Sequence, residues 1–124
     1  LQGLWQARAD GRDALVLPDG EHHATLDTAA WLQSQGAVIR AVPVDGVGRI
    51  DGAAFTAALP RAALATALVV NNEVGTVQDA AEIAAAASEA DVPLHLDAVG
   101  AVGHLPVSFR AWRGEAAGAA GLGR

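Results

Sequence analysis

Short apolar runs alternate with helix-like segments along this chain, and the alternation predicts a parallel sheet covered by helices. The apolar runs lie at residues 13–18, 37–44, 65–70 and 93–97. Each run is short and bounded by polar or turn-forming residues, as a buried strand is. Helix patterns occupy residues 24–35, 52–59 and 80–90, and the end of another helix is expected within residues 1–9. This order is typical of right-handed β-α-β crossovers, so the predicted fold class is α/β.

Capping residues and prolines refine the predicted boundaries. Gly36 closes the first full helix pattern, and Asp51 is a candidate N-cap for the second. Pro43 cannot donate a ladder hydrogen bond, which indicates that it lies in an edge strand or at a strand end. Thr76 and Asp79 match a helix-start signature in which both side chains satisfy backbone amides. The helix that follows them is expected to bury one face, made of Ala80, Ile83, Ala84 and Ala87.

Composition limits the chain to one core and one broad class. Its 124 residues are 52% hydrophobic with a formal charge of −6, which suits a single globular domain of ordinary surface. The acidic balance argues against a nucleic-acid partner, and no apolar run approaches the ~20 residues of a membrane span. We expect a partial domain at residues 1–109, an irregular tail at 110–124, and a cytoplasmic location by default.

Lysine and cysteine are both absent from the chain, and both absences matter for chemistry. All 8 basic residues are arginine, and there is no cysteine. The chain alone therefore cannot supply a lysine amine that forms an imine with a carbonyl compound, nor a thiol. Disulfides are excluded for the same reason.

Three polar residues follow predicted strands and are the first candidates for a site. They are His22 after the first strand, Asn72 after the third and Asp97 after the fourth. Ligands of open α/β sheets bind beyond the carboxyl ends of the strands, so these side chains should face one crevice. A carboxylate that ends an apolar run needs a cation or several donors, and a protonated heterocyclic nitrogen would suit it.

A metal site is the alternative reading of the same residues. His95 and Asp97 alternate onto one face of a strand, and with His22 they would make a set of two histidines and one carboxylate. No further residues of the pattern supply the partners that usually orient metal ligands. We therefore favour an organic ligand.

Several motifs in order resemble the cysteine desulfurase branch of the class V aminotransferases. The interval of 25 residues between Asn72 and Asp97 also fits that family, and linked motifs are more specific than any one of them. The resemblance covers roughly residues 14–109. The motifs are EHHATLD at 21–27, NNEVGTVQ at 71–78, HLDAV at 95–99 and VGHLPV at 102–107.

The resemblance implies a site for pyridoxal phosphate (PLP) in the large domain of a fold-type I enzyme. In such a site His22 would stack on the pyridine ring and act as a catalytic residue that helps to move protons, and Asp97 would pair with the protonated ring nitrogen. Asn72 would lie beside the phenolic oxygen, and Val99 would pack under the opposite ring face. The family converts cysteine to alanine and passes the sulfur to an enzyme cysteine, which implies roles in sulfur transfer and iron–sulfur cluster assembly.

The chain also departs from the family pattern. Gly100 stands where the family usually has a glutamine that reaches the phenolic oxygen. The PLP lysine and the persulfide cysteine have no counterpart, so the chain is expected to be a central fragment that is inactive alone. The family implies a homodimer and a possible sulfur-acceptor protein. Another class V aminotransferase or lyase, or a non-catalytic α/β domain that binds a ligand or partner, remains open.

Overall fold

The computed structural model describes residues 1–71, 73–108 and 110–112. Helices and strands alternate along the described residues, as the hydrophobic pattern predicts. Their bounds are α1 Gln2–Gln6, β1 Ala14–Pro18, α2 His23–Ser34, β2 Val38–Val42, α3 Gly52–Ala58, β3 Leu64–Leu68, α4 Ala80–Glu89 and β4 Leu94–Asp97.

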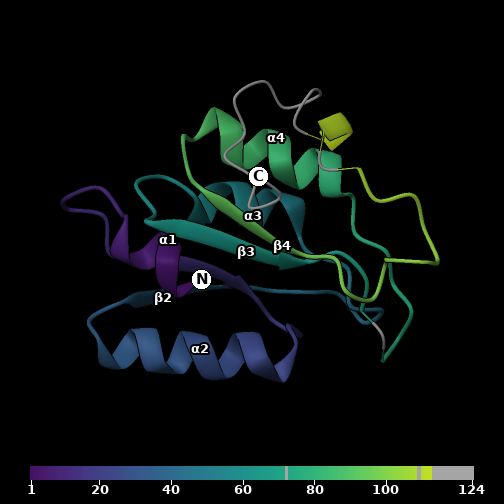
Figure 1. Ribbon diagram of the computed structural model, residues 1–124, viewed down its shortest axis with the longest axis horizontal. Coiled ribbons are helices and arrows are strands. Elements are labelled where there is room, and N and C mark those ends of the chain that lie inside the picture. Colours follow the sequence, from purple (N-terminus) through teal and green to yellow (C-terminus); the bar gives the residue numbers. More distant parts are fainter. Residues whose placement is uncertain (72, 109, 113–124) are drawn as a thin grey trace.

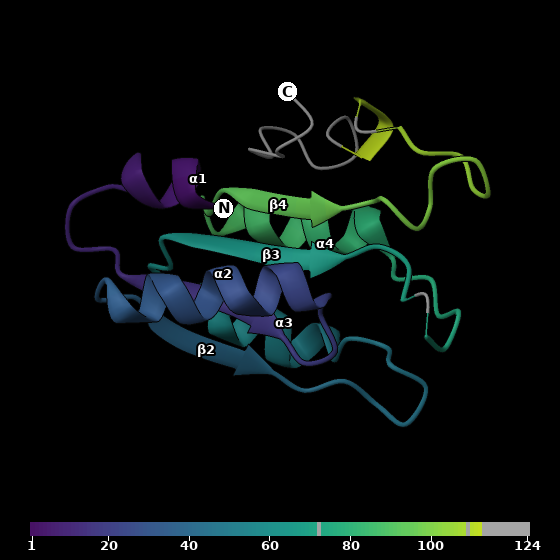
Figure 2. The same cartoon turned by 60° about the horizontal axis from the view of Figure 1, so that its bottom comes forward.

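The strands form one parallel sheet between two layers of helices. Its order is β2-β1-β3-β4, and each neighbouring pair is parallel. Helices α1 and α2 lie on one face of this sheet, whereas α3 and α4 lie on the other (Figures 1 and 2). The predicted α/β class is confirmed, and β2 lies at an edge as Pro43 indicates.

Each face of the sheet has its own hydrophobic core, and the two cores share the strands. Every residue of β1 and of β3 is buried, which explains their almost uninterrupted apolar sequence. Leu15 and Leu64 pack with Leu32 of α2 on one face. On the other face Val16 and Ala65 pack with Phe55 of α3 and with the predicted face of α4, namely Ala80, Ile83, Ala84 and Ala87.

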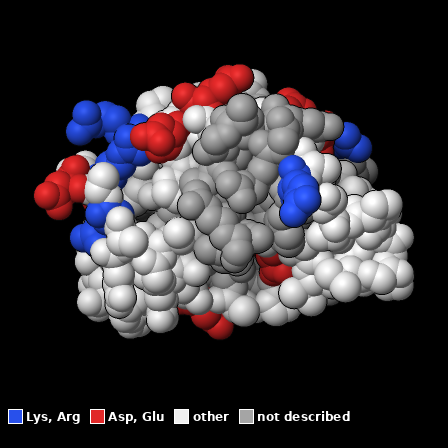
Figure 3. Space-filling view, turned by 45° about the horizontal axis from the view of Figure 1, so that its top comes forward, with Lys and Arg blue, Asp and Glu red and all other residues white. Residues whose placement is uncertain are grey.

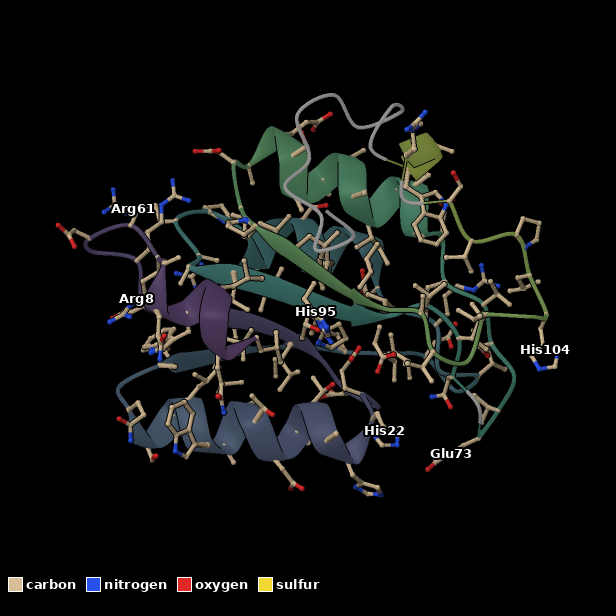
Figure 4. The ribbon with its side chains drawn as sticks, in the orientation of Figure 1. Arg8, His22, Arg61, Glu73, His95 and His104 are labelled. Atoms are coloured by element: carbon tan, nitrogen blue, oxygen red, sulfur yellow. The ribbon has the colours of Figure 1, made fainter. Side chains whose placement is uncertain are left out.

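The strand order places a topological switch point between β1 and β3. After β1 the chain moves outward to β2, and it then returns past β1 to form β3 and β4. Ligands of open α/β sheets bind in the crevice at such a point, outside the carboxyl ends of the strands. His22, Glu73 and His104 lie at this edge, and Arg8 and Arg61 lie at the opposite edge (Figure 4).

The predicted cap of α4 is confirmed for Asp79 and wrong for Thr76. Helix α4 begins at Ala80, and its N-cap is Asp79, whose side chain accepts a hydrogen bond from the Glu82 N–H at 3.0 Å. The Thr76 hydroxyl caps no helix, because it donates instead to the Val47 carbonyl of the β2–α3 loop. A tertiary contact has replaced the local capping interaction.

The last described residues return to the body of the protein. Residues 110–112 are helical, and Trp112 packs against the core beneath α3 and α4. Most of the tail expected at 110–124 falls outside the described residues, and the boundary at residue 109 stays a prediction. No described helix combines the length and apolar character needed to span a bilayer.

Candidate functional site

Asp97 ends β4 with its carboxylate at the carboxyl edge of the sheet. Its Oδ1 accepts a hydrogen bond from the Val99 N–H at 3.1 Å, so the chain turns away immediately after the strand. Leu94 and Leu96 are buried in the core beneath α3 and α4, whereas His95 and Asp97 alternate onto the other face and are half-buried. The interaction with Val99 holds one carboxylate oxygen and leaves Oδ2 to a cationic donor.

A cavity of about 520 Å³ lies in front of this carboxylate. That volume falls within the range of about 300–1,000 Å³ that is usual for small-molecule sites. Its walls come from the start of the chain, from the first turns of α2 and from the end of β4. They are Leu1, Gln2, Gly3, Ala24, Thr25, Thr28, His95, Asp97 and Val99.

Val99 gives this cavity an apolar wall beside the charged one. It is 84% exposed, an unusual surface for a valine that follows a buried strand. The sequence predicts a ring-facing role for Val99, and its position beside Asp97 in the cavity wall supports that role without testing it.

His95 reaches the cavity from the middle of β4. Its Nδ1 lies 2.9 Å from the hydroxyl oxygen of Thr66 on β3, and Thr66 is fully buried. Burial lowers the pKa of His95, the chain's N-terminal ammonium lowers it further, and Asp97 opposes both. His95 therefore favours a neutral imidazole, and in Figure 4 its ring lies between β4 and α2.

His22 lies beside the cavity rather than in its wall. It is the N-cap of α2, and its Nδ1 accepts a hydrogen bond from the Ala24 N–H at 3.1 Å. The ring is exposed and meets His23 edge-on, with 6.2 Å between ring centroids. Ala24 and Thr25, which follow His22 in the chain, line the cavity. The predicted stacking of His22 on a ligand ring is untested.

Asn72 lies outside the described residues, and its predicted contact stays a prediction. The turn that carries it is described on both sides. Asn71 Oδ1 accepts hydrogen bonds from the N–H groups of Glu73 at 2.9 Å and Val74 at 3.4 Å. This turn lies at the carboxyl edge of β3, on the same edge as Asp97.

Gln78 joins this turn to the neighbouring loop, a role that no local pattern predicts. Its Oε1 accepts from the Ile50 N–H at 3.0 Å, and its Nε2 donates to the Gly48 carbonyl at 2.7 Å. The side chain is buried. The oxygen and the nitrogen of the side-chain amide thus both help to hold the β2–α3 loop against the segment before α4.

Glu21 is a buried acidic residue whose burial sequence reasoning missed. It is 6% exposed, and its Oε1 accepts a hydrogen bond from the Leu68 N–H at 2.7 Å. Its Oε2 is buried and has no partner among the described residues. The pKa of Glu21 is raised to about 7, chiefly by burial and further by the nearby charge of Asp97, against the lowering effect of the Leu68 hydrogen bond. A glutamate before two histidines gives no sign of this burial.

Other parts of the described surface are weaker candidates for a functional site. A second cavity of about 250 Å³ lies between α3 and α4, on the far face of the sheet from Asp97. Figure 3 shows acidic and basic side chains interspersed on the face it presents, with no extended basic patch there. Within the described ranges, no group of three or more histidine, cysteine or acidic side chains could hold a metal ion.

Comparison with known proteins agrees with the fold. The family model for Aminotransferase class-V matches residues 1–115. An IscS-like cysteine desulfurase of Mycobacterium tuberculosis is 38% identical over 118 residues, covering 90% of this chain and 30% of the relative. A cysteine desulfurase of Gluconacetobacter diazotrophicus is 41% identical over 102 residues, covering 81% of this chain and 26% of the relative. The chain thus spans about three-tenths of the length of these relatives.

Solved structures of other proteins share the fold of this chain. A NifS-like protein superposes with a TM-score of 0.84 at 24% identity, covering 90% of this chain and 31% of that one, which shows the fold. The structure titled SspA in complex with cysteine has a TM-score of 0.69 at 33% identity, covering 76% of this chain and 27% of that one. The chain belongs to the class V aminotransferase family, as a stretch similar to the cysteine desulfurases.

Proposed function

We propose that this chain forms the ring-binding part of a PLP-dependent cysteine desulfurase. The observation that carries the proposal is the Asp97 carboxylate, which lies at the carboxyl end of β4 in the wall of a cavity of about 520 Å³. Family membership and the cysteine desulfurase relatives agree with it. The proposed substrate is L-cysteine, and the proposed products are L-alanine and an enzyme-bound sulfur.

The residues present fit the ring of PLP. Asp97 Oδ1 is held by Val99, and Oδ2 is placed to accept a hydrogen bond from a protonated ring nitrogen. The exposed valine side chain offers an apolar surface for one face of a flat ring. Bound PLP supplies an electron sink for the bond that breaks at the substrate α-carbon, and a carboxylate at the ring nitrogen strengthens that sink.

His22 has a positioning role in this proposal. Because its Nδ1 accepts from the Ala24 N–H, the neutral ring carries its proton on Nε2. The helix cap therefore fixes the orientation of the imidazole beside the cavity, where the ring can stack on the ligand. Asn72 is proposed to approach the phenolic oxygen, as the family motif implies.

Covalent steps need groups that these residues do not contain. The 124 residues include no lysine and no cysteine, so they can hold cofactor and substrate but cannot form the imine or carry the sulfur. The homodimer, the sulfur-acceptor protein and the role in iron–sulfur cluster assembly are proposals for the whole enzyme. The cytoplasmic location also stays a prediction.

The lack of lysine and cysteine also agrees with a second candidate function. A non-catalytic domain that binds a ligand or a partner needs neither lysine nor cysteine, and Gly100 in place of the family glutamine agrees with lost catalysis. This candidate does not require PLP to bind at Asp97. PLP binding therefore separates the two.

Equilibrium dialysis of PLP against the purified chain tests the proposed function. We expect weak, noncovalent binding that Asp97→Asn reduces by about tenfold or more, as loss of a charge-assisted hydrogen bond does. Asp10→Asn is the matched control, because it removes the same charge from an exposed turn after α1. No binding by the wild-type chain, or equal binding by Asp97→Asn, would favour the non-catalytic candidate.

A further inference from the structure

The sheet opens between β1 and β3 at the carboxyl edge. These strands pair at Leu15↔Leu64 and Val16↔Ala65, whereas β3 stays paired with β4 as far as Leu68↔Asp97. The Val69 N–H donates to the Asp97 carbonyl on the β4 side. Alternate N–H groups of a strand point to opposite neighbours, so the Leu68 N–H points into the gap beside β1.

Glu21 fills this gap. It follows β1 by three positions, and its Oε1 accepts from the Leu68 N–H at 2.7 Å in place of a strand carbonyl. A carboxylate is an expensive way to complete a sheet, because burial of a charge costs more than burial of an amide. The second oxygen, Oε2, is buried with no partner in the described part of the chain. An ordinary packing role does not require that arrangement.

The position of Glu21 couples it to the proposed cofactor residue. Leu68, its hydrogen-bond partner, is the register partner of Asp97. The Asp97 charge raises the pKa of Glu21, in addition to the larger effect of burial. A negative charge at Asp97 therefore favours the protonated form of Glu21.

We propose that Glu21 and Asp97 form a coupled acid pair, in which Glu21 holds a proton while Asp97 lacks a cationic partner and releases it when one binds. The identity of that partner, the pyridinium of PLP, rests on the proposed function. The cation cancels the charge that Asp97 projects onto Glu21, and the proton on the Glu21 carboxyl passes to solvent. Glu21 is thus a positioning residue whose protonation follows the charge at Asp97.

The surrounding ionisable groups do not offer Glu21 a better partner. Among the described residues, Asp97 is the one charged group that acts on the pKa of Glu21, and the Leu68 N–H is its hydrogen-bond donor. Strand β3 has no ionisable side chain. His95 favours its neutral form, and its Nδ1 is occupied by Thr66. The protonation of Glu21 therefore depends on whether the charge of Asp97 is neutralised by a cation.

Carbon-13 NMR titration of the Glu21 carboxyl, assigned through its own backbone, tests the pair without PLP. The wild-type chain should titrate near pH 7. Asp97→Asn should lower the midpoint by about 0.5–1 pH unit, as loss of a nearby like charge does. Asp13→Asn is the matched control, because it removes an exposed charge at the opposite end of β1 and should leave the midpoint unchanged. An unchanged midpoint in Asp97→Asn, with the fold verified by circular dichroism, would overturn the pair.

The same titration with saturating PLP tests the release step. The Glu21 midpoint should fall in the wild-type chain and stay constant in Asp97→Asn. PLP that binds without lowering the midpoint overturns the release step but not the proposed function. PLP that fails to bind at any pH contradicts the proposed function and with it the release step, while the titration without PLP still decides whether the acid pair exists.

Discussion

Thr66 Oγ1 and His95 Nδ1 lie 2.9 Å apart, joining two neighbouring strands just below the proposed cofactor carboxylate. The contact fixes the His95 ring, and the lowered pKa of His95 keeps that ring neutral. A neutral, oriented imidazole in the cavity wall adds no positive charge that would compete with a ligand for Asp97.

Replacing Thr66 with valine should therefore destabilise the protein with little change in volume. Thr66 is fully buried, and Thr66→Val removes the hydroxyl that pairs with His95. We expect a loss of about 1 kcal/mol in the free energy of unfolding, measured by urea denaturation. Thr56→Val, the same change at an exposed position of α3, serves as the control and should cost less. Equal costs would show that the contact with His95 contributes nothing.

The free energy of unfolding should depend on pH because the pKa of Glu21 is raised in the folded protein. Its pKa is about 7 in the folded protein against an ordinary value of 4.5, so between these values the folded state binds more protons than the unfolded state. The associated stability is fully present below pH 4.5 and is lost as pH rises through 7. The difference amounts to at most about 3 kcal/mol at 1.36 kcal/mol per pH unit.

Glu21→Gln should remove that loss, and the comparison isolates Glu21 from other groups. His95 contributes with the opposite sign, because its lowered pKa costs stability as pH falls below 6.5. The difference between wild-type and Glu21→Gln unfolding free energies, followed from pH 4.5 to 8, cancels the His95 contribution. Glu89→Gln, at an exposed position, should leave the wild-type slope in place. A wild-type slope retained in Glu21→Gln would assign the effect to another group.

Gln78 should matter for stability more than its position in a turn implies. Gln78→Leu leaves the Ile50 N–H and the Gly48 carbonyl without their partner. We expect a cost of about 2 kcal/mol in the free energy of unfolding, because unsatisfied buried groups are expensive. Gln33→Leu on the exposed face of α2 is the matched control. Faster amide hydrogen exchange at Ile50 should accompany the loss, and unchanged exchange there would contradict the role.

Gly100→Gln should strengthen PLP binding. A Cβ at Gly100 would lie 3.4 Å from the Val70 carbonyl oxygen and 3.6 Å from Val70 Cβ, which is close to ordinary contact. The resemblance implies that a glutamine here reaches the phenolic oxygen, and one such hydrogen bond is worth about 1 kcal/mol, or about fivefold in affinity. Gly100→Ala tests the space alone and should not change affinity. Weaker binding by Gly100→Gln than by Gly100→Ala would contradict this placement.

The sequence predicts the fold well because the main signals are local. Buried parallel strands are short apolar runs, and the buried face of α4 repeats with helical spacing, so both can be recognised without tertiary information. The capping role of Thr76 was wrong because Thr76 fits a local capping pattern, yet its hydroxyl bonds to Val47 across the structure. A local pattern cannot show that a distant carbonyl will compete for the same donor.

The candidate site likewise contains residues that local patterns predict and residues that they do not. Asp97 was expected at the end of the fourth strand and does end β4, because strand ends can be predicted from hydrophobicity, whereas the role of Val99 stays a prediction. Glu21 and Gln78 were missed because their burial depends on how β1 separates from β3 and on how two loops meet. The use of His22 as the α2 cap was also missed, and its expected stacking on the ring stays a prediction.

The central claim is that the cavity beside Asp97 receives the ring of PLP, and NMR mapping tests it most directly. Isotope-labelled chain is titrated with PLP, and backbone and methyl shifts are followed. The account predicts saturable shifts at Thr25, Thr28 and Val99, which are lost in Asp97→Asn. Shifts centred instead on Ile50, Phe55 and Ile83, which line the cavity on the opposite face, would contradict it.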